Sequence, residues 1–148
     1  MAPLIVMLVG WAAFRGLGAL GVLDDASTWH GALRFAMALM FVFTAISHFH
    51  PRVRPDLVRM VPPQLPRPDL LVTLTGILEL IGAIGLLIPG LIRLSAYALM
   101  LLLVALFPAN VNAARKQLRI AGRPAPALAF RLPLQLFWIA ALWWVARA

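Results

Sequence analysis

The fold is decided by residues 70–88, which read LLVTLTGILELIGAIGLLI. This apolar run is long enough to cross a bilayer, because a membrane-spanning helix needs about 20 mainly apolar residues. Glu79, the only glutamate of the chain, lies near its middle. A carboxylate at that depth costs roughly 2.5–3.5 kcal/mol on insertion scales. Glu79 is therefore expected to be either a proton-handling or binding group or a buried structural partner.

The composition outside this run indicates the same class of protein. Of 148 residues, 63% are hydrophobic and 12% are charged, and the mean hydropathy is +0.93. A soluble domain of this size could not bury so much apolar surface. The chain has no cysteine, so it offers neither a disulfide nor a thiol redox couple. The net charge of +8 is better explained by membrane orientation and anionic lipid than by nucleic acid.

The sequence predicts an all-α integral membrane bundle that forms a single domain over residues 1–148. The expected spanning helices are 3–23, 31–49, 70–88, 91–110 and 127–146. Only Pro89-Gly90 separates the third helix from the fourth, which predicts a tight antiparallel hairpin. Asp24, Asp25 or Ser27 is expected to cap the second helix.

Alternate loops differ sharply in their content of lysine and arginine. The loops 50–69 and 111–126 are basic, and the other two loops, which contain Asp24-Asp25 and Pro89-Gly90, are not. The positive-inside rule then predicts a multi-pass membrane protein with a cytoplasmic N-terminus. Trp29 and the pair Trp143-Trp144 fall on the opposite, outer interface, where aromatic residues are enriched.

The basic loop 50–69 has a composition of its own. Six prolines between Pro51 and Asp69 exclude a continuous helix. Leucine, valine and methionine are nevertheless frequent in it. We expect a rigid segment that packs under the bundle or lies against the headgroups, and the alternative is a stiff surface loop anchored to lipid phosphate by arginine.

The surroundings of Glu79 on its helix predict where it faces. Thr75 and Gly76 precede it by one turn, and Gly82 and Ala83 follow it by one turn. Small residues allow another backbone to approach closely. The carboxyl should therefore face protein, where it needs a cation or a hydrogen-bond partner.

Histidines stand at the end of the second segment. His48 and His50 are two residues apart, so they point to different sides of a helix and cannot chelate one metal ion from it; no metal site is predicted. His48 shares a helix face with Thr44. Its alternative role is that of a polar residue at the membrane interface.

Two further polar positions are candidates. Arg15 interrupts the first apolar segment, and an ion pair with Glu79 would offset the cost of its burial; Asp24 or Asp25 is the other possible partner. Asn110 follows Pro108, which is expected to kink its helix. Asn110 could line a site or simply cap a helix end.

A family resemblance runs through the region 33–114. It is carried by residues 47–49, 55–56, 60–66, 75–80, 85–89 and 107–111, which read SHF, PD, MVPPQLP, TGILEL, GLLIP and FPANV. In these motifs the chain resembles the DoxX-like family of small bacterial membrane proteins. The resemblance implies a four-helix membrane core, to which this sequence adds an N-terminal helix. It also implies that the protein lies in the bacterial inner (plasma) membrane. It also implies an association with membrane redox complexes and matches the polar positions His48, Glu79 and Asn110.

The sequence leaves two classes of function open, and whether the protein is an enzyme is left open with them. In the first, a redox-associated membrane protein binds a quinone or another lipophilic molecule, and its partners belong to a membrane redox complex or are further copies of the chain. The catalytic residues would be Glu79 and His48, and the binding residues Asn110, Thr44, Thr75 and Arg15. In the second, the chain is a non-catalytic accessory subunit that stabilises a larger complex. No cofactor motif is present, so a quinone is the one named candidate.

Overall fold

The computed structural model describes residues 2–147, and it confirms the all-α prediction. In chain order, the helices are α1 (Ala2–Ala19), the short 3-10 helix η1 (Asp24–Ala26), α2 (Trp29–Phe49), α3 (Arg54–Met60), α4 (Pro68–Gly85), α5 (Ile92–Arg115) and α6 (Leu128–Val145). A two-stranded antiparallel hairpin, β1 (Arg119–Ile120) and β2 (Arg123–Pro124), is the one sheet among the described residues. Five helices, α1, α2, α4, α5 and α6, are long and apolar enough to cross a membrane.

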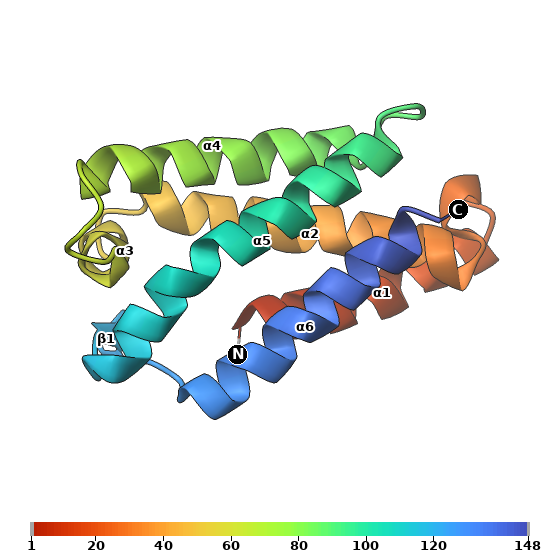
Figure 1. The fold of residues 1–148 in the computed structure, drawn as a ribbon. Helices are drawn as coiled ribbons and strands as arrows, with labels where there is room; N and C mark the ends of the chain where they lie inside the picture. Colours follow the sequence, from red (N-terminus) through yellow and green to blue (C-terminus); the bar gives the residue numbers. More distant parts are fainter. Residues whose placement is uncertain (1, 148) are drawn as a thin grey trace.

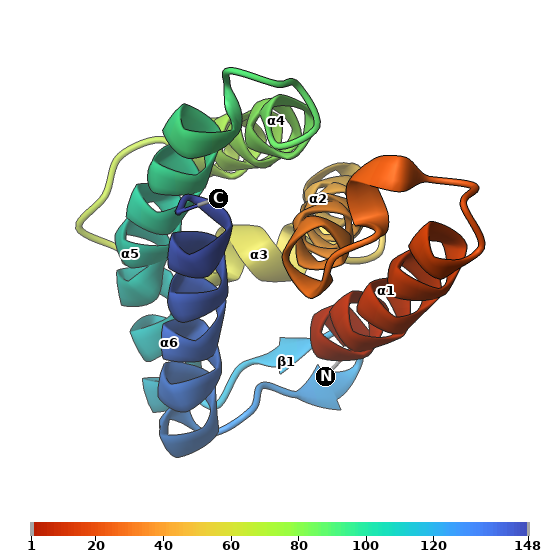
Figure 2. The same ribbon diagram turned by 90° about the vertical axis from the view of Figure 1, so that its right-hand side faces the viewer.

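The long helices form a ring with one helix outside it. Helix α2 packs on α4, α4 on α5, α5 on α6, and α6 returns to α2. The backbone of helix α1 lies close to α2 and η1 and to no other described element. Figure 2, which views the bundle nearly end-on, shows α1 on the far side of α2 from α4 and α5. Helix α3 and the hairpin lie at one end of the bundle, and η1 and the C-terminus lie at the other (Figure 1).

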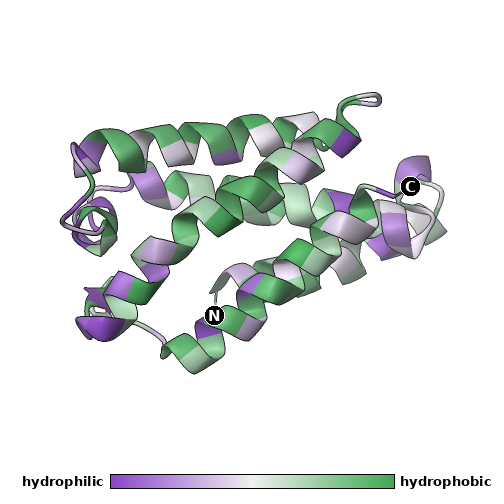
Figure 3. Ribbon diagram, in the orientation of Figure 1, coloured by the Kyte–Doolittle hydropathy of each residue, from purple (hydrophilic) through white to green (hydrophobic). Residues whose placement is uncertain are grey.

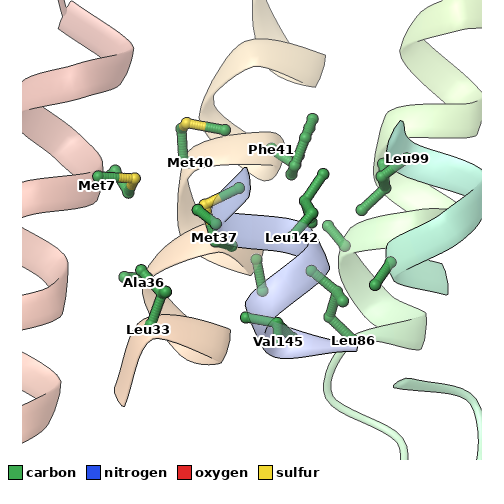
Figure 4. Packing of buried hydrophobic residues seen from close by; sticks show 14 of the residues in the cluster. Met7, Leu33, Ala36, Met37, Met40, Phe41, Leu86, Leu99, Leu142 and Val145 are labelled. Atoms are coloured by element: carbon green, nitrogen blue, oxygen red, sulfur yellow. The ribbon is translucent and has the colours of Figure 1, made fainter. Parts of the chain in front are cut away.

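The core is formed by apolar side chains from all five long helices. Met37 and Phe41 of α2, Leu99 of α5 and Leu142 of α6 are almost fully buried, and Figure 4 shows them gathered in one cluster. Large apolar side chains elsewhere on the long helices are exposed in the isolated chain. In Figure 3 the long helices are coloured mainly as hydrophobic, and hydrophilic residues are most frequent toward the ends of the bundle. This distribution suits a lipid solvent.

Several predicted boundaries were wrong for local reasons. Helix α1 ends at Ala19 because Gly21, at φ 68°, allows Val22 N–H to donate to the Leu17 carbonyl (3.0 Å), which closes a Schellman motif. The cap of α2 is Thr28, whose hydroxyl accepts from Gly31 N–H (3.0 Å), and not Asp24, Asp25 or Ser27.

The hairpin between the third and fourth predicted segments is also wider than expected. Helix α4 begins two residues early, at Pro68, and ends at Gly85, and α5 begins at Ile92. Helix α5 then continues through Pro108 to Arg115, five residues beyond the predicted end. The proline therefore does not terminate the helix, and Asn110 lies within it.

The proline-rich loop packs against the bundle, as predicted. Its short helix α3 contacts α2, α4, α5 and β1. Asn112 of α5 donates to the carbonyl oxygens of Met60 (2.9 Å) and Val61 (3.3 Å). Asp56 accepts from the backbone N–H of Ala121 (2.8 Å) and so joins α3 to the hairpin. These contacts make the loop a folded part of the molecule.

Aromatic residues gather at the η1 end. Trp11 of α1 donates to the carbonyl oxygen of Trp29 (2.8 Å) and lies edge-to-face against both Trp29 and Trp144. His30 Nε2 donates to the Trp144 carbonyl oxygen (2.7 Å). The prediction that Trp29 and Trp144 lie at the same end of the bundle is therefore confirmed.

Candidate functional site

Glu79 faces the interior of the bundle. It lies on the side of α4 that also buries Val72, Gly76 and Ala83, and only 4% of its surface is exposed. This face packs against α2. The helical spacing of small residues predicted this orientation, and the structure confirms it.

The neighbour of Glu79 across the interface is His48. His48 Nε2 lies 3.7 Å from Glu79 Oε2, and the two side chains are 11% and 6% exposed. The other ring nitrogen, Nδ1, lies 2.8 Å from the Val72 carbonyl oxygen and 3.2 Å from Thr75 Oγ1. A carbonyl oxygen can only accept a hydrogen bond, so Nδ1 must carry a proton.

The protonation of Nδ1 has a chemical consequence for the pair. In neutral His48, Nε2 is then an acceptor that faces Glu79 Oε2, and the carboxyl carries the proton. In the ionised pair, Nε2 carries it instead. If the pair binds one exchangeable proton, that proton can lie on either the Glu79 carboxyl or His48 Nε2 while the bond from Nδ1 to Val72 is kept.

A glycine brings the two helices together at this point. A Cβ atom added to Gly76 would lie 2.6 Å from the Cβ of His48. Real side chains do not pack at that distance, so Gly76 lets α4 approach α2 at the histidine. The sequence prediction that small residues near Glu79 mark a close helix contact is confirmed at this position.

The carboxyl is incompletely paired. Glu79 Oε2 is buried and has no hydrogen-bond partner among residues 2–147, and its distance of 3.7 Å to His48 Nε2 is longer than a hydrogen bond. Thr44 lies beside the carboxyl, but its hydroxyl donates to the Phe41 carbonyl (3.0 Å). Thr75 likewise donates to carbonyl oxygens of its own helix. Glu79 Oε2 is therefore free to form a hydrogen bond with a ligand atom.

Of the predicted partners of Glu79, the structure brings only His48 into contact. Arg15 forms no ion pair with Glu79, because α1 does not reach α4. The Arg15 guanidinium instead lies over the Trp29 ring at 5.4 Å. Asp25, the other proposed partner of Arg15, is paired with Arg34 (2.7 Å). The Arg15–Glu79 hypothesis was wrong.

Asn110 belongs to a separate polar cluster between α5 and α6. Its Nδ2 donates to Gln135 Oε1 (3.3 Å), and its Oδ1 accepts from Arg131 (2.6 Å). Gln135, which is 5% exposed, also donates to the Leu103 carbonyl oxygen (2.8 Å). The Gln135 amide of α6 therefore forms hydrogen bonds to two residues of α5, Leu103 and Asn110. The side-chain bonds of Asn110 within the described residues go to α6 and not to His48 or Glu79.

Sequence reasoning missed Gln135 and Arg54. Gln135 had a signal, since it is an amide within an apolar segment. Arg54 had none that separates it from the other arginines of its loop. It donates to the carbonyl oxygens of His48 (3.0 Å) and Asp69 (3.0 Å) and to Thr73 Oγ1 (2.9 Å).

An apolar groove lies on the side of α4 that faces α5. Its volume is about 520 Å³, and its lining includes Leu78, Gly82 and Gly85 of α4 and Ser95 and Leu102 of α5. Leu78 adjoins Glu79 in the sequence, and Gly82 follows it by one turn. The groove therefore reaches along α4 to the level of Glu79.

Comparison with known proteins gives one match. The family described as Domain of unknown function (DUF8561) matches residues 37–146, which include His48, Glu79 and Asn110. No curated protein and no solved structure matches the chain.

Proposed function

The chain belongs to the DUF8561 family, and we propose that it is a membrane protein in which His48 and Glu79 bind a quinone or another lipophilic molecule. The proposal includes a redox-associated role. Glu79 and His48 hold the exchangeable proton, and a quinone that is reduced to a quinol takes up protons together with electrons. In a chain without cysteine, a partner protein or a bound cofactor supplies the electrons.

One observation carries the proposal. Within the part of the chain that the structure describes, Glu79 Oε2 is buried beside His48 Nε2 without a hydrogen-bond partner. An unsatisfied buried polar group costs roughly 1–3 kcal/mol. A carbonyl or hydroxyl oxygen placed beside the 3.7 Å gap can lie within hydrogen-bond distance of both side chains. A ligand with such an oxygen would remove the cost, and the proton of the pair would lie next to it.

Each residue of the pair has a distinct role in this proposal. Glu79 donates or accepts the proton at the ligand oxygen. His48 forms the second hydrogen bond and can return a proton to Glu79 through Nε2, because its Nδ1 is held by Val72. Thr44 and Thr75 flank the pair as binding residues. Asn110 and Arg15, which were predicted as binding residues, contact neither member of the pair in the described structure.

The apolar groove between α4 and α5 supports a lipophilic ligand. A membrane-spanning chain presents such a groove to the hydrocarbon of the bilayer. Because the lining includes Leu78 and Gly82, an apolar tail in the groove would run along the helix that carries Glu79.

The resemblance to the DoxX-like family supports the redox part of the proposal. The ring of α2, α4, α5 and α6, with α1 outside it, suits a four-helix core with an added N-terminal helix. We further propose that the protein lies in the bacterial inner membrane with α3 and the basic hairpin in the cytoplasm, since the two loops that contain them, 50–69 and 111–126, carry most of the arginines.

The alternative is a non-catalytic accessory subunit. The observation that favours it is the close contact of Gly76 with His48, since a polar pair between tightly packed helices also stabilises a bundle. In that case the pair would hold α2 to α4, and protein partners would act through the apolar outer surfaces.

Purification in a mild detergent tests the proposal directly. The absorbance spectrum and the mass spectrum of co-purifying small molecules should show a quinone or a related lipophile that is absent from the preparation of a Glu79→Gln variant. A ligand-free preparation with a stoichiometric protein partner would instead support the accessory subunit.

A further inference from the structure

We propose that Arg54 is a positioning residue for the His48–Glu79 pair and that α3 is the element that holds it in place. The inference deepens the proposed function and rests on it for the ligand-binding readout only. Arg54 touches neither the proposed ligand position nor Glu79. It acts through the backbone of His48 and through the first turns of α4.

The hydrogen bonds of Arg54 join the two helices that carry the pair. One terminal nitrogen donates to the His48 carbonyl oxygen (3.0 Å), in the last turn of α2. The other donates to the Asp69 carbonyl oxygen (3.0 Å) and to Thr73 Oγ1 (2.9 Å), in the first turns of α4. Only a planar guanidinium offers several donors in one fixed fork. Arg54 therefore sets the distance between the ends of α2 and α4.

Arg54 lies where the end of α2 has carbonyl groups without a partner in the helix. The last carbonyl groups of a helix have no partner within it, and a cation there is favourable. His50-Pro51 ends α2 just beyond His48, so the His48 carbonyl is one of these free acceptors. The hydrogen bond from Arg54 to this carbonyl oxygen fixes the backbone of His48, whose ring faces Glu79.

The geometry leaves little tolerance for a shift of α2. Gly76 lies against the Cβ of His48, and the His48 ring is anchored to Val72 on the same helix as Glu79. A displacement of the end of α2 changes the Nδ1 bond and the 3.7 Å gap together. Loss of Arg54 is therefore expected to release the ring from Val72.

Arg59 provides a matched control. It lies on the same helix α3, its side chain is 61% exposed, and it pairs with Asp56 in its own helix. Arg59→Gln removes the same charge from α3 without touching α2 or α4. An effect of Arg54→Gln that Arg59→Gln does not share must come from the contacts to the helix ends.

The test uses nitrogen-15 NMR of the full-length protein with labelled histidine in detergent. The chain has three histidines, and a His48→Gln variant assigns the signals of His48. In the wild type, Nδ1 should carry a proton, as the bond to Val72 requires. Arg54→Gln should give a mixture of the two ring tautomers, whereas Arg59→Gln should give the wild-type spectrum. A wild-type His48 signal in folded Arg54→Gln would overturn the proposal.

A second readout separates this inference from the proposed function. If the wild type binds a quinone analogue, Arg54→Gln should weaken binding by about tenfold, which corresponds to the loss of one hydrogen bond between the displaced His48 ring and the ligand. If the wild type binds none and Arg54→Gln still alters the tautomer, the proposed function fails and the positioning role stands. Should Arg54→Gln not fold, Arg54→Lys keeps the charge but lacks the fork, and the same tautomer mixture is expected from it.

Discussion

The unusual feature of the His48–Glu79 pair is the gap between His48 Nε2 and Glu79 Oε2. The 3.7 Å separation leaves Glu79 Oε2 without a hydrogen bond in the described structure, although His48 Nε2 lies opposite it. In most buried pairs this distance would shorten to a hydrogen bond. Here the gap stays open because the His48 ring is held elsewhere. The His48 Cβ packs against Gly76, and its Nδ1 donates to the Val72 carbonyl oxygen.

A substitution at Gly76 tests this contact. Gly76→Ala places a Cβ atom against His48 and should lower the thermal unfolding midpoint, because overpacking typically costs about 1–3 kcal/mol. Gly16→Ala is the matched control, since a Cβ atom at Gly16 meets no atom within 4 Å. Equal midpoints for the two variants would show that α2 and α4 are not in close contact at His48.

Some features of this pair could be predicted from the sequence, and others could not. The burial of Glu79 was predictable because a lone acid in an apolar run must face protein, and small residues one turn away showed which side. The bond from His48 to Val72 was not predictable, because any residue offers a carbonyl oxygen. Arg54 was hidden for the same reason, since two of its three acceptors are backbone carbonyls.

Among the elements, the short helix α3 connects the ends of three long helices. Helix α3 is joined to α5 by Asn112, to the hairpin by Asp56 and to α2 and α4 by Arg54. The sequence predicted that the proline-rich loop would pack, from its mixture of apolar residues and prolines. It could not predict the short helix or its partners, because Asn112 and Met60 lie 52 positions apart.

Limited trypsin digestion tests the packing of α3. The bonds after Arg52 and Arg59 should resist cleavage in the wild type. Asn112→Ala removes the donor to Met60 and Val61 and should speed cleavage at Arg59. Gln64→Ala, at an exposed position of the same loop, should leave the rate unchanged. Rapid cleavage of the wild-type loop would show that it is a free linker.

The polar cluster between α5 and α6 permits a separate test. Gln135→Leu keeps the approximate volume but removes the bonds to Leu103 and Asn110. Hydrogen bonds between membrane helices contribute about 0.6–1.7 kcal/mol, so the unfolding midpoint should fall modestly. Gln64→Leu, at the exposed glutamine, is the control. An unchanged midpoint for Gln135→Leu would mean that the cluster does not stabilise the bundle.

At the scale of the whole molecule, the two ends of the bundle differ in chemistry. The end with α3 and the hairpin carries most of the arginines, and the end with η1 carries the tryptophan cluster. The composition and the five apolar segments predicted the all-α class. The closure of the ring by α6 on α2 was not predictable, because apolar faces in a membrane do not specify their partners.

Cysteine accessibility tests the proposed orientation. The chain has no cysteine, so single cysteines can be introduced at Ser27 and Gln117, which are both exposed. An impermeant reagent should label position 27 only from outside the cell and position 117 only from the cytoplasm. Labelling of position 27 from the cytoplasmic side would reverse the topology.

The most direct test of the central claim is a binding titration of a quinone analogue against three proteins in detergent. These are the wild type, Glu79→Gln and the control Asp24→Asn, which neutralises an exposed acid at the opposite end from α3. Wild type and Asp24→Asn should bind equally, whereas Glu79→Gln should keep its helical content and unfolding midpoint and lose binding. Wild-type affinity in Glu79→Gln, or unfolding of that variant together with no binding by the wild type, would contradict the claim.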